Sequence, residues 1–289
     1  MQALRAFAVL SVVLYHLWPT RLPGGYVGVD IFFAISGFLI IGHLLREIDT
    51  NGRVSLSRFW ARRARRLLPA SLLVLIATGV ATVFWVPITL WQQWFKEIGA
   101  AAIYVQNWVL SADAVDYLGA ENQPSAVQHF WSLSVEEQFY IFWPLVIVLI
   151  LILSRGRSPR RTIGAVLILI TVASFAYSTL AVAVDPAPAY FVTHSRAWEF
   201  GAGGVLALLA SSEVRTWPVV RSLVSWAGII ALVGTVFLYT ADTPFPGAAA
   251  LLPIAGTLAV IWAGTPAVTW APSAAMSLRP VQWVGDVSY

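Results

Sequence analysis

The sequence predicts an all-α protein, a multispanning transmembrane helical bundle of about eight spans with one additional interfacial or re-entrant helix. Of its 289 residues, 58% are hydrophobic and only 11% are charged, and the mean hydropathy is +0.75. Soluble globular domains carry about 25% charged residues, so this composition is typical of a membrane protein. A crossing needs roughly 20 apolar residues, and the chain accommodates about eight of them in a single domain, residues 1–289.

Composition also excludes several kinds of chemistry within this chain. It has no cysteine, which excludes a disulfide, a thiolate zinc site and a cysteine nucleophile. The isoelectric point is near 9.6, but the basic residues concentrate in one segment beside an apolar stretch, which indicates membrane topology rather than nucleic-acid binding. We therefore expect the lipid bilayer as a partner and no nucleic acid.

Eight apolar segments are predicted to be spans, and they alternate with short polar or basic connections. They lie at about residues 4–18, 26–45, 67–87, 139–153, 162–184, 197–209, 223–239 and 247–264. A turn with two prolines and two glycines separates the first two. The loop at 46–66 is rich in arginine, so the positive-inside rule places this loop and the N-terminus in the cytoplasm.

Residues 91–110 do not fit a crossing. They mix glutamine, lysine and glutamate with several aromatic residues, so we expect an interfacial or re-entrant helix there. A second basic run at 155–161 is also assigned to the cytoplasm, and parity then makes 88–136 one long outer segment. Residues 265–289 are expected to return to the cytoplasm and to stop where another span would begin.

Four polar residues lie within the first two spans: Arg5, His16, Asp30 and Ser36. Ionisable groups inside a membrane span are costly to keep and therefore mark candidate functional sites. Arg5 and His16 are separated by roughly 16 Å along a helix, so we expect Arg5 near the inner face and His16 near the outer one. Ser36 is a weak candidate nucleophile, because no base adjoins it in sequence and a buried serine usually bonds back to its own helix.

Ionisable residues from several spans are expected near the outer level of His16. They are Asp30, Glu136, Glu137, Arg196 and Glu199. A carboxylate from Asp30 or Glu136 would orient His16 as a general base near neutral pH; the alternative is a histidine that simply ends its helix in the interface. Arg196 and Glu199 are three residues apart, so an ion pair within one helix explains them as well as a binding role does.

The segment HFWSLSVEEQFYIFWP, residues 129–144, contains two adjacent glutamates. Ser134 and Glu137 match the S-x-x-E capping box that begins a helix, which gives Glu137 a structural explanation. Glu136 has no such explanation. It is therefore the better candidate for a functional carboxylate.

The segment FWARRARRLLP, residues 59–69, places arginines three apart on one helical face. Arg62 with Arg65, and Arg63 with Arg66, form guanidinium pairs suited to bidentate contact with phosphates. Arginines just inside a span are more commonly topology anchors that contact anionic lipid headgroups. From the residues alone, lipid contact is the preferred interpretation.

Five segments, in this order and spacing, closely resemble the acyltransferase-3 family of bacterial membrane O-acyltransferases. They are LRAFAVLSVVLYH, GGYVGVDIFFAISGFLI, FWARRARRLLPA, HFWSLSVEEQFYIFWP and SRAWEFGAGGVLAL. The resemblance implies a multi-pass enzyme of the bacterial cytoplasmic membrane. Such an enzyme takes an acyl group, usually acetyl, from acyl-CoA as co-substrate and places it on a hydroxyl of an extracytoplasmic carbohydrate, with no bound cofactor or metal ion.

Taken together, the residues and the resemblance assign three sets of candidates. The catalytic set is His16, Asp30 and Glu136, with His16 as general base. The donor-binding set is Arg5, Arg62, Arg63 and Arg66. The acceptor-side or structural set is Ser36, Trp131, Glu137, Arg196 and Glu199. The last two match a motif of members that carry a C-terminal SGNH-hydrolase-like domain, which is expected in the full-length protein or in trans.

The predicted mechanism is a direct transfer without an acyl-enzyme, in which His16 deprotonates the acceptor hydroxyl. The competing hypothesis is a transporter or flippase for a glycan or an acyl donor, because ionisable groups inside spans also line transport pathways. Consumption of acyl-CoA with formation of a new ester distinguishes the enzyme from the transporter.

Overall fold

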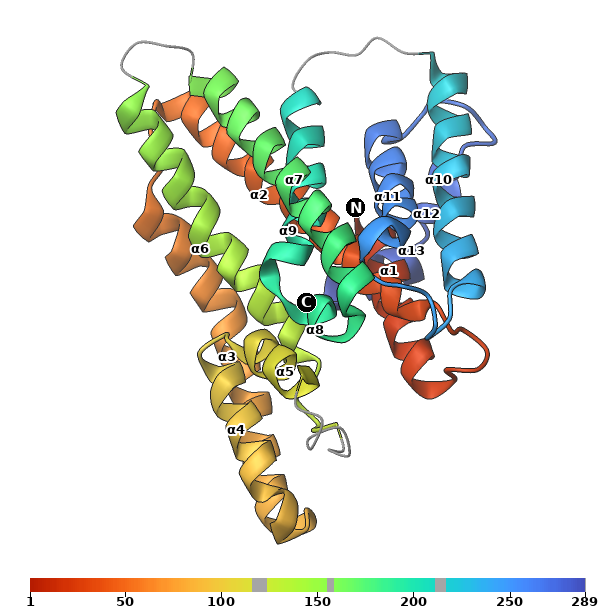
Figure 1. The fold of residues 1–289 in the computed structure, drawn as a ribbon. Coiled ribbons are helices and arrows are strands. Elements are labelled where there is room, and N and C mark those ends of the chain that lie inside the picture. Colours follow the sequence, from red (N-terminus) through yellow and green to blue (C-terminus); the bar gives the residue numbers. More distant parts are fainter. Residues whose placement is uncertain (116–123, 155–158, 211–216, 289) are drawn as a thin grey trace.

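The computed structural model describes residues 1–115, 124–154, 159–210 and 217–288, which form helices and no β-strand (Figure 1). The α-helices are α1 (Gln2–Leu17), α2 (Gly28–Asn51), α3 (Leu56–Trp85), α4 (Trp91–Ala102), α5 (Gln106–Val115), α6 (Phe130–Leu153), α7 (Pro159–Val184), α8 (Pro186–Phe191), α9 (Thr193–Leu209), α10 (Pro218–Leu238), α11 (Leu251–Ala263), α12 (Ser273–Met276) and α13 (Arg279–Val287). Short 3-10 helices, η1 (Gly25–Val27), η2 (Ile88–Leu90) and η3 (Gly247–Ala250), precede α2, α4 and α11. The predicted all-α class is confirmed.

Within the described part of the chain, five helices are long and apolar enough to cross a membrane, namely η1–α2, α3, α6, α7 and α10. Each of the eight predicted spans coincides with a helix, the other three being the shorter α1, α9 and α11. The most apolar stretch of α2 is 67% buried, whereas those of α3 and α7 are 17% and 22% buried. The protein is thus a multi-pass membrane bundle with α2 at its centre, and the number of crossings stays a prediction.

The helices alternate in direction along the chain. In Figure 1, α2, α6 and α9 end toward the top of the view, where α7 and α10 begin, while α3 ends toward the bottom. This alternation agrees with the predicted order of connections. Two arginines of the second basic run, Arg155 and Arg157, lie outside the described residues.

The arginine-rich segment predicted as a loop is mostly helical. Helix α2 continues to Asn51 and α3 already begins at Leu56, so residues 52–55 alone connect them. The prediction of a loop across 46–66 is wrong, because leucine, arginine and alanine are good helix formers and the apolar residues that follow continue the same helix. The arginines from Arg58 to Arg66 therefore stand in a fixed register on the first turns of α3.

The segment predicted as one interfacial helix forms two, α4 and α5. They meet at Tyr104, whose φ is +57°. The Glu97 carboxylate is buried and accepts hydrogen bonds from Gln106 at 3.3 Å and Ser125 at 2.5 Å, which ties the two helices to the chain before α6. Figure 1 shows α4 beside α3 below the rest of the bundle.

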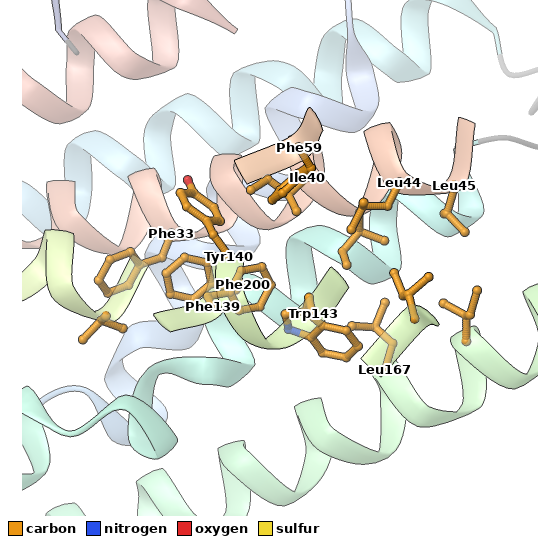
Figure 2. Close-up of a cluster of buried hydrophobic side chains, with 14 of the residues drawn as sticks. Phe33, Ile40, Leu44, Leu45, Phe59, Phe139, Tyr140, Trp143, Leu167 and Phe200 are labelled. Atoms are coloured by element: carbon orange, nitrogen blue, oxygen red, sulfur yellow. The ribbon is translucent and has the colours of Figure 1, made fainter. Parts of the chain in front are cut away.

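The centre of the bundle is an aromatic stack (Figure 2). Phe200 of α9 lies between Phe33 of α2 and Phe139 of α6, with ring centroids 4.4 Å apart in both pairs. Offset aromatic pairs bury a large apolar area in a defined geometry. The stack therefore fixes α2, α6 and α9 against one another.

Helices α2 and α9 cross in direct backbone contact. A Cβ atom at Gly37 would lie 1.9 Å from the Phe200 carbonyl oxygen, and one at Gly203 would lie 2.0 Å from the Ala34 carbonyl oxygen. Only glycine fits at these two positions, and close approach at small residues is a common way for membrane helices to pack. Gly37 directly follows Ser36, so the crossing fixes the position of the part of α2 that carries Ser36.

The last described helices return to the beginning of the chain. Helix α13 packs against the start of α1, where the Gln2 side-chain amide donates a hydrogen bond to the Asp286 carboxylate. Ser288 follows α13 and reaches the wall of a cavity that also contains Arg5. The two ends of the described chain therefore help to build the interior of the bundle.

Candidate active site

A carboxylate, two hydroxyl groups and a guanidinium meet at the junction of α2, α3 and α6. Ser36 and Tyr140 both donate hydrogen bonds to Oε1 of Glu136, and the Tyr140 hydroxyl lies 3.0 Å from Ser36 Oγ. Nη2 of Arg63 is 3.6 Å from the same carboxylate oxygen. The Arg63 guanidinium carbon lies 3.4 Å from the centre of the Tyr140 ring, a cation–π contact. We call these four residues the serine–glutamate cluster.

The start of α6 sets the position of Glu136. The helix begins at Phe130 with His129 at its N-cap, whereas the capping box predicts Ser134 as the N-cap. Ser134 donates instead to the Phe130 carbonyl at 3.0 Å, so the capping-box interpretation of Ser134 and Glu137 is wrong. Because α6 starts early, Glu136 lies in its second turn, where its carboxylate reaches Arg63 of α3.

The first of three cavities, which we call the arginine cavity, has a volume of about 300 Å³. Its polar lining comprises Ser36, His43, Arg62, Arg63, Arg66 and Tyr140. Nη2 of Arg62 is 2.9 Å from Nε2 of His43, so the imidazole helps to hold this guanidinium. Three of the four predicted donor-binding arginines therefore share one concave site.

The central cavity, of about 350 Å³, lies on the other side of Ser36. Its lining includes Arg5, Ser36, His129 and Glu136 among mostly apolar side chains. Arg5 is only 6% exposed. The structure thus separates Arg5 from the arginine cavity and brings it to the cavity that also contains Glu136.

The histidine cavity is the largest, at about 910 Å³, and adjoins the central one. Both His16 and His129 line it, and His129 together with Val29 and Ser132 also lines the central cavity. Withdrawal of His129 from solvent and the nearby His16 lower the pKa of the His129 imidazole. The cavity therefore holds two imidazoles, one of them favoured in its neutral form.

The three cavities adjoin through shared residues. Ser36 joins the arginine cavity to the central cavity, and His129 joins the central cavity to the histidine cavity. Volumes of this size are typical of small-molecule sites. The three cavities therefore lie in a row, with the arginines at one end, the serine–glutamate cluster beside the middle one and the histidines at the other end.

The predicted carboxylate partner of His16 is replaced by a backbone group. The Nδ1 atom of His16 lies 2.8 Å from the Val12 carbonyl oxygen, which can only accept, so Nδ1 carries the proton. This leaves Nε2 free to act as a base in the neutral ring. Among the described contacts, Asp30 and Glu136 each pair with an arginine instead.

Asp30 belongs to a buried ion triad with Arg196 and Glu199. Nη1 of Arg196 lies 2.8 Å from Asp30 and 3.0 Å from Glu199, and all three residues are 0% exposed. Nε of Arg196 donates to the Tyr190 carbonyl at 3.0 Å. The predicted Arg196–Glu199 pair is confirmed. None of the three triad residues lines any of the three cavities. The triad links α2 to α9, and Asp30 is engaged there rather than with the imidazole of His16.

Of the remaining predicted residues, Trp131 lines a cavity and Glu137 does not. Trp131 lines the histidine cavity and packs its ring 5.0 Å from that of Tyr190. Glu137 is half-buried and lines none of the three cavities. Sequence reasoning missed Tyr140 and His129, although Tyr140 lies one helical turn after Glu136 and such i, i+4 residues are neighbours on a helix.

Comparison with known proteins identifies the family of the chain. The chain matches the acyltransferase-3 family, described as an acyltransferase domain, over residues 1–289. It is 33% identical to the peptidoglycan O-acetyltransferase OatA of Listeria monocytogenes, over 99% of this chain and 47% of that protein. It is 31% identical to the putative peptidoglycan O-acetyltransferase YrhL of Bacillus subtilis, over 100% of this chain and 46% of that protein. No solved structure matches the chain.

The chain belongs to the acyltransferase-3 family, as its five segments predicted. A putative O-acetyltransferase of Staphylococcus aureus is a further relative, 38% identical over 75% of this chain and 34% of that protein. The chain spans about half the length of the peptidoglycan O-acetyltransferases that it matches.

Proposed function

We propose that the protein is a membrane O-acetyltransferase that moves an acetyl group from acetyl-CoA to a hydroxyl of an extracytoplasmic carbohydrate. The relatives named as peptidoglycan O-acetyltransferases make peptidoglycan the first acceptor to test. The observation that carries the proposal is the run of three adjoining cavities, with arginines at one end and histidines at the other. An SGNH-type domain, in the full-length protein or in trans, is a proposed partner on the acceptor side.

The arginine cavity is the proposed donor site. Coenzyme A carries several phosphate groups, and guanidinium groups bind phosphates through charged, often bidentate hydrogen bonds. Arg62, Arg63 and Arg66 line one cavity, which favours a ligand site over separate lipid contacts. The cavity opens on Ser36 and Tyr140, so a thioester whose phosphates were held there would lie beside the serine–glutamate cluster.

The histidine cavity is the proposed acceptor site. Its walls include aromatic side chains such as Tyr26, Trp131 and Tyr190, and it is large enough for a sugar unit. Nε2 of His16 is the proposed base that takes the proton of the acceptor hydroxyl. A neutral imidazole near physiological pH suits this task.

Arg66→Ala is expected to weaken acetyl-CoA binding by about 10- to 100-fold, because it removes a charged hydrogen bond worth roughly 1.5–3 kcal/mol. Isothermal titration of the purified protein with acetyl-CoA measures this loss. The matched control is Arg65→Ala, since Arg65 is adjacent on α3 but bonds to its own helix, at the Ala61 carbonyl. Equal acetyl-CoA affinity in the two variants would contradict a donor site in the arginine cavity and would leave contact with lipid headgroups as the role of its arginines.

A continuous route through the bundle would also suit a transporter or flippase. Analysis of the products distinguishes the two functions. The enzyme consumes acetyl-CoA, releases free CoA and leaves a new ester on the acceptor, whereas a transporter moves its substrate unchanged.

A further inference from the structure

Ser36 has a different kind of hydrogen-bonding partner from three other buried serines of the membrane helices. Ser11, Ser71 and Ser134 each donate to a carbonyl four residues earlier in their own helix, at 2.8, 3.0 and 3.0 Å. This is the usual way to satisfy a buried hydroxyl. Ser36 instead donates to the carboxylate of Glu136 on another helix. The base that is missing beside Ser36 in the sequence is supplied by a residue 100 positions away.

The groups around Ser36 are those that activate a serine nucleophile. Glu136 can accept the hydroxyl proton, and Arg63, 3.6 Å from its carboxylate, helps to orient it. The Tyr140 hydroxyl lies 3.0 Å from Ser36 Oγ, and on turning from Glu136 its one proton can be donated to the oxyanion that develops during attack on a carbonyl. A nucleophile in contact with a base, and a base held by a third group, is the arrangement of covalent catalysis.

The position of Ser36 favours a relay between donor and acceptor. Ser36 lines both the arginine cavity and the central cavity, whereas His16 lines neither. A direct transfer would need the thioester to travel through the central cavity to the histidines. Transfer to Ser36 would let CoA remain in the arginine cavity while the acyl group alone enters the central cavity.

We propose that Ser36 carries the acyl group as a covalent ester between two half-reactions. The inference rests on the proposed acetyltransferase function. It replaces the direct transfer that the sequence favoured, because that preference depended on the absence of a base near Ser36.

In the first half-reaction Ser36 Oγ attacks the thioester carbonyl carbon and its proton passes to Glu136. The C–S bond breaks, the thiolate takes the proton from Glu136, and CoA leaves as a free thiol. In the second, the acceptor oxygen attacks the serine ester carbonyl while His16 takes the acceptor's proton. The C–O bond to Ser36 breaks, Glu136 takes up a proton from solvent and passes it to the serine oxygen, and His16 releases the acceptor's proton to solvent. No oxidant or further reactant is needed.

Isotope exchange tests the ester without an acceptor. The purified full-length protein is incubated in proteoliposomes with acetyl-CoA and isotopically labelled CoA, and formation of labelled acetyl-CoA is measured. A serine ester makes the first half-reaction reversible, so the wild type is expected to exchange label. Peptide mass spectrometry should then find an added acetyl group on Ser36.

Ser36→Ala is expected to lose exchange by at least about 100-fold, the scale of a lost catalytic group. The matched control is Ser134→Ala, which removes another buried hydroxyl near the site but one that bonds only to its own helix; it should exchange like the wild type. Acetyl-CoA binding by Ser36→Ala, measured by titration, shows that this variant remains folded.

The outcomes separate the relay from the proposed function. A wild type that transfers acetyl to the acceptor but shows no exchange, or a Ser36→Ala variant that transfers at the wild-type rate, overturns the relay and leaves the function standing. A wild type that neither exchanges nor transfers acetyl from acetyl-CoA overturns the proposed function itself.

Discussion

Replacing Arg196 with methionine is expected to destabilise the protein by about 3–5 kcal/mol, the cost of breaking a buried ion pair on one side. The guanidinium pairs with both Asp30 and Glu199 in a site where all three residues are fully buried. Methionine would leave two carboxyl groups in an apolar interior. Thermal unfolding in detergent, followed by circular dichroism, measures the loss.

Glu199→Gln is the matched control for Arg196→Met. Glutamine has nearly the shape of glutamate but no charge, so the change removes one carboxylate and leaves Arg196 paired with Asp30 at 2.8 Å. We expect it to unfold near the wild-type temperature. The account of the triad as the link between α2 and α9 would be contradicted if Arg196→Met unfolded at the wild-type temperature too.

His16→Ala is expected to lower acetyl transfer by about 100- to 10,000-fold, the usual contribution of a general base. The protein should remain folded, because His16 is exposed at the end of α1 and its ring bonds only to its own helix. The measurement is formation of acetylated carbohydrate by purified variants in proteoliposomes with acetyl-CoA.

His194→Ala serves as the control for His16→Ala. The His194 ring packs against Tyr177 and Trp108 and lines none of the three cavities, so its loss should leave transfer unchanged. His129→Ala tests the alternative that His129, which also lines the histidine cavity, is the base. Full activity in His16→Ala together with loss in His129→Ala would move the role of base to His129.

Helices and their order could be predicted because they depend on local composition. Eight apolar stretches predicted the spans, and the arginine spacing on α3 predicted that Arg63 and Arg66 share a face. The error at 46–66 arose where one helix ends and the next begins within a few residues. Charge marked the side of the membrane there, but it carried no information on where each helix stops.

The partners of the ionisable residues could not be predicted, because they depend on how distant helices cross. Ser36 and Glu136 meet only because Gly37 lets α2 touch α9 and because Phe33 and Phe139 stack on Phe200. Asp30 lies on the same helix as Ser36, yet it faces Arg196. The parity argument placed residues by depth in the membrane, and depth alone does not say which side of a helix meets which neighbour.

The most direct test of the account supplies the two substrates on opposite sides of a membrane. The purified full-length protein is reconstituted in one orientation in sealed vesicles, and acetyl-CoA and a carbohydrate acceptor are supplied on chosen sides. We predict acetylated carbohydrate when acetyl-CoA is on the side of the arginine cavity and the acceptor is on the side of the histidine cavity, and none when the two are exchanged. Equal product from both arrangements, or product only when both substrates share one side, would contradict a route through the bundle.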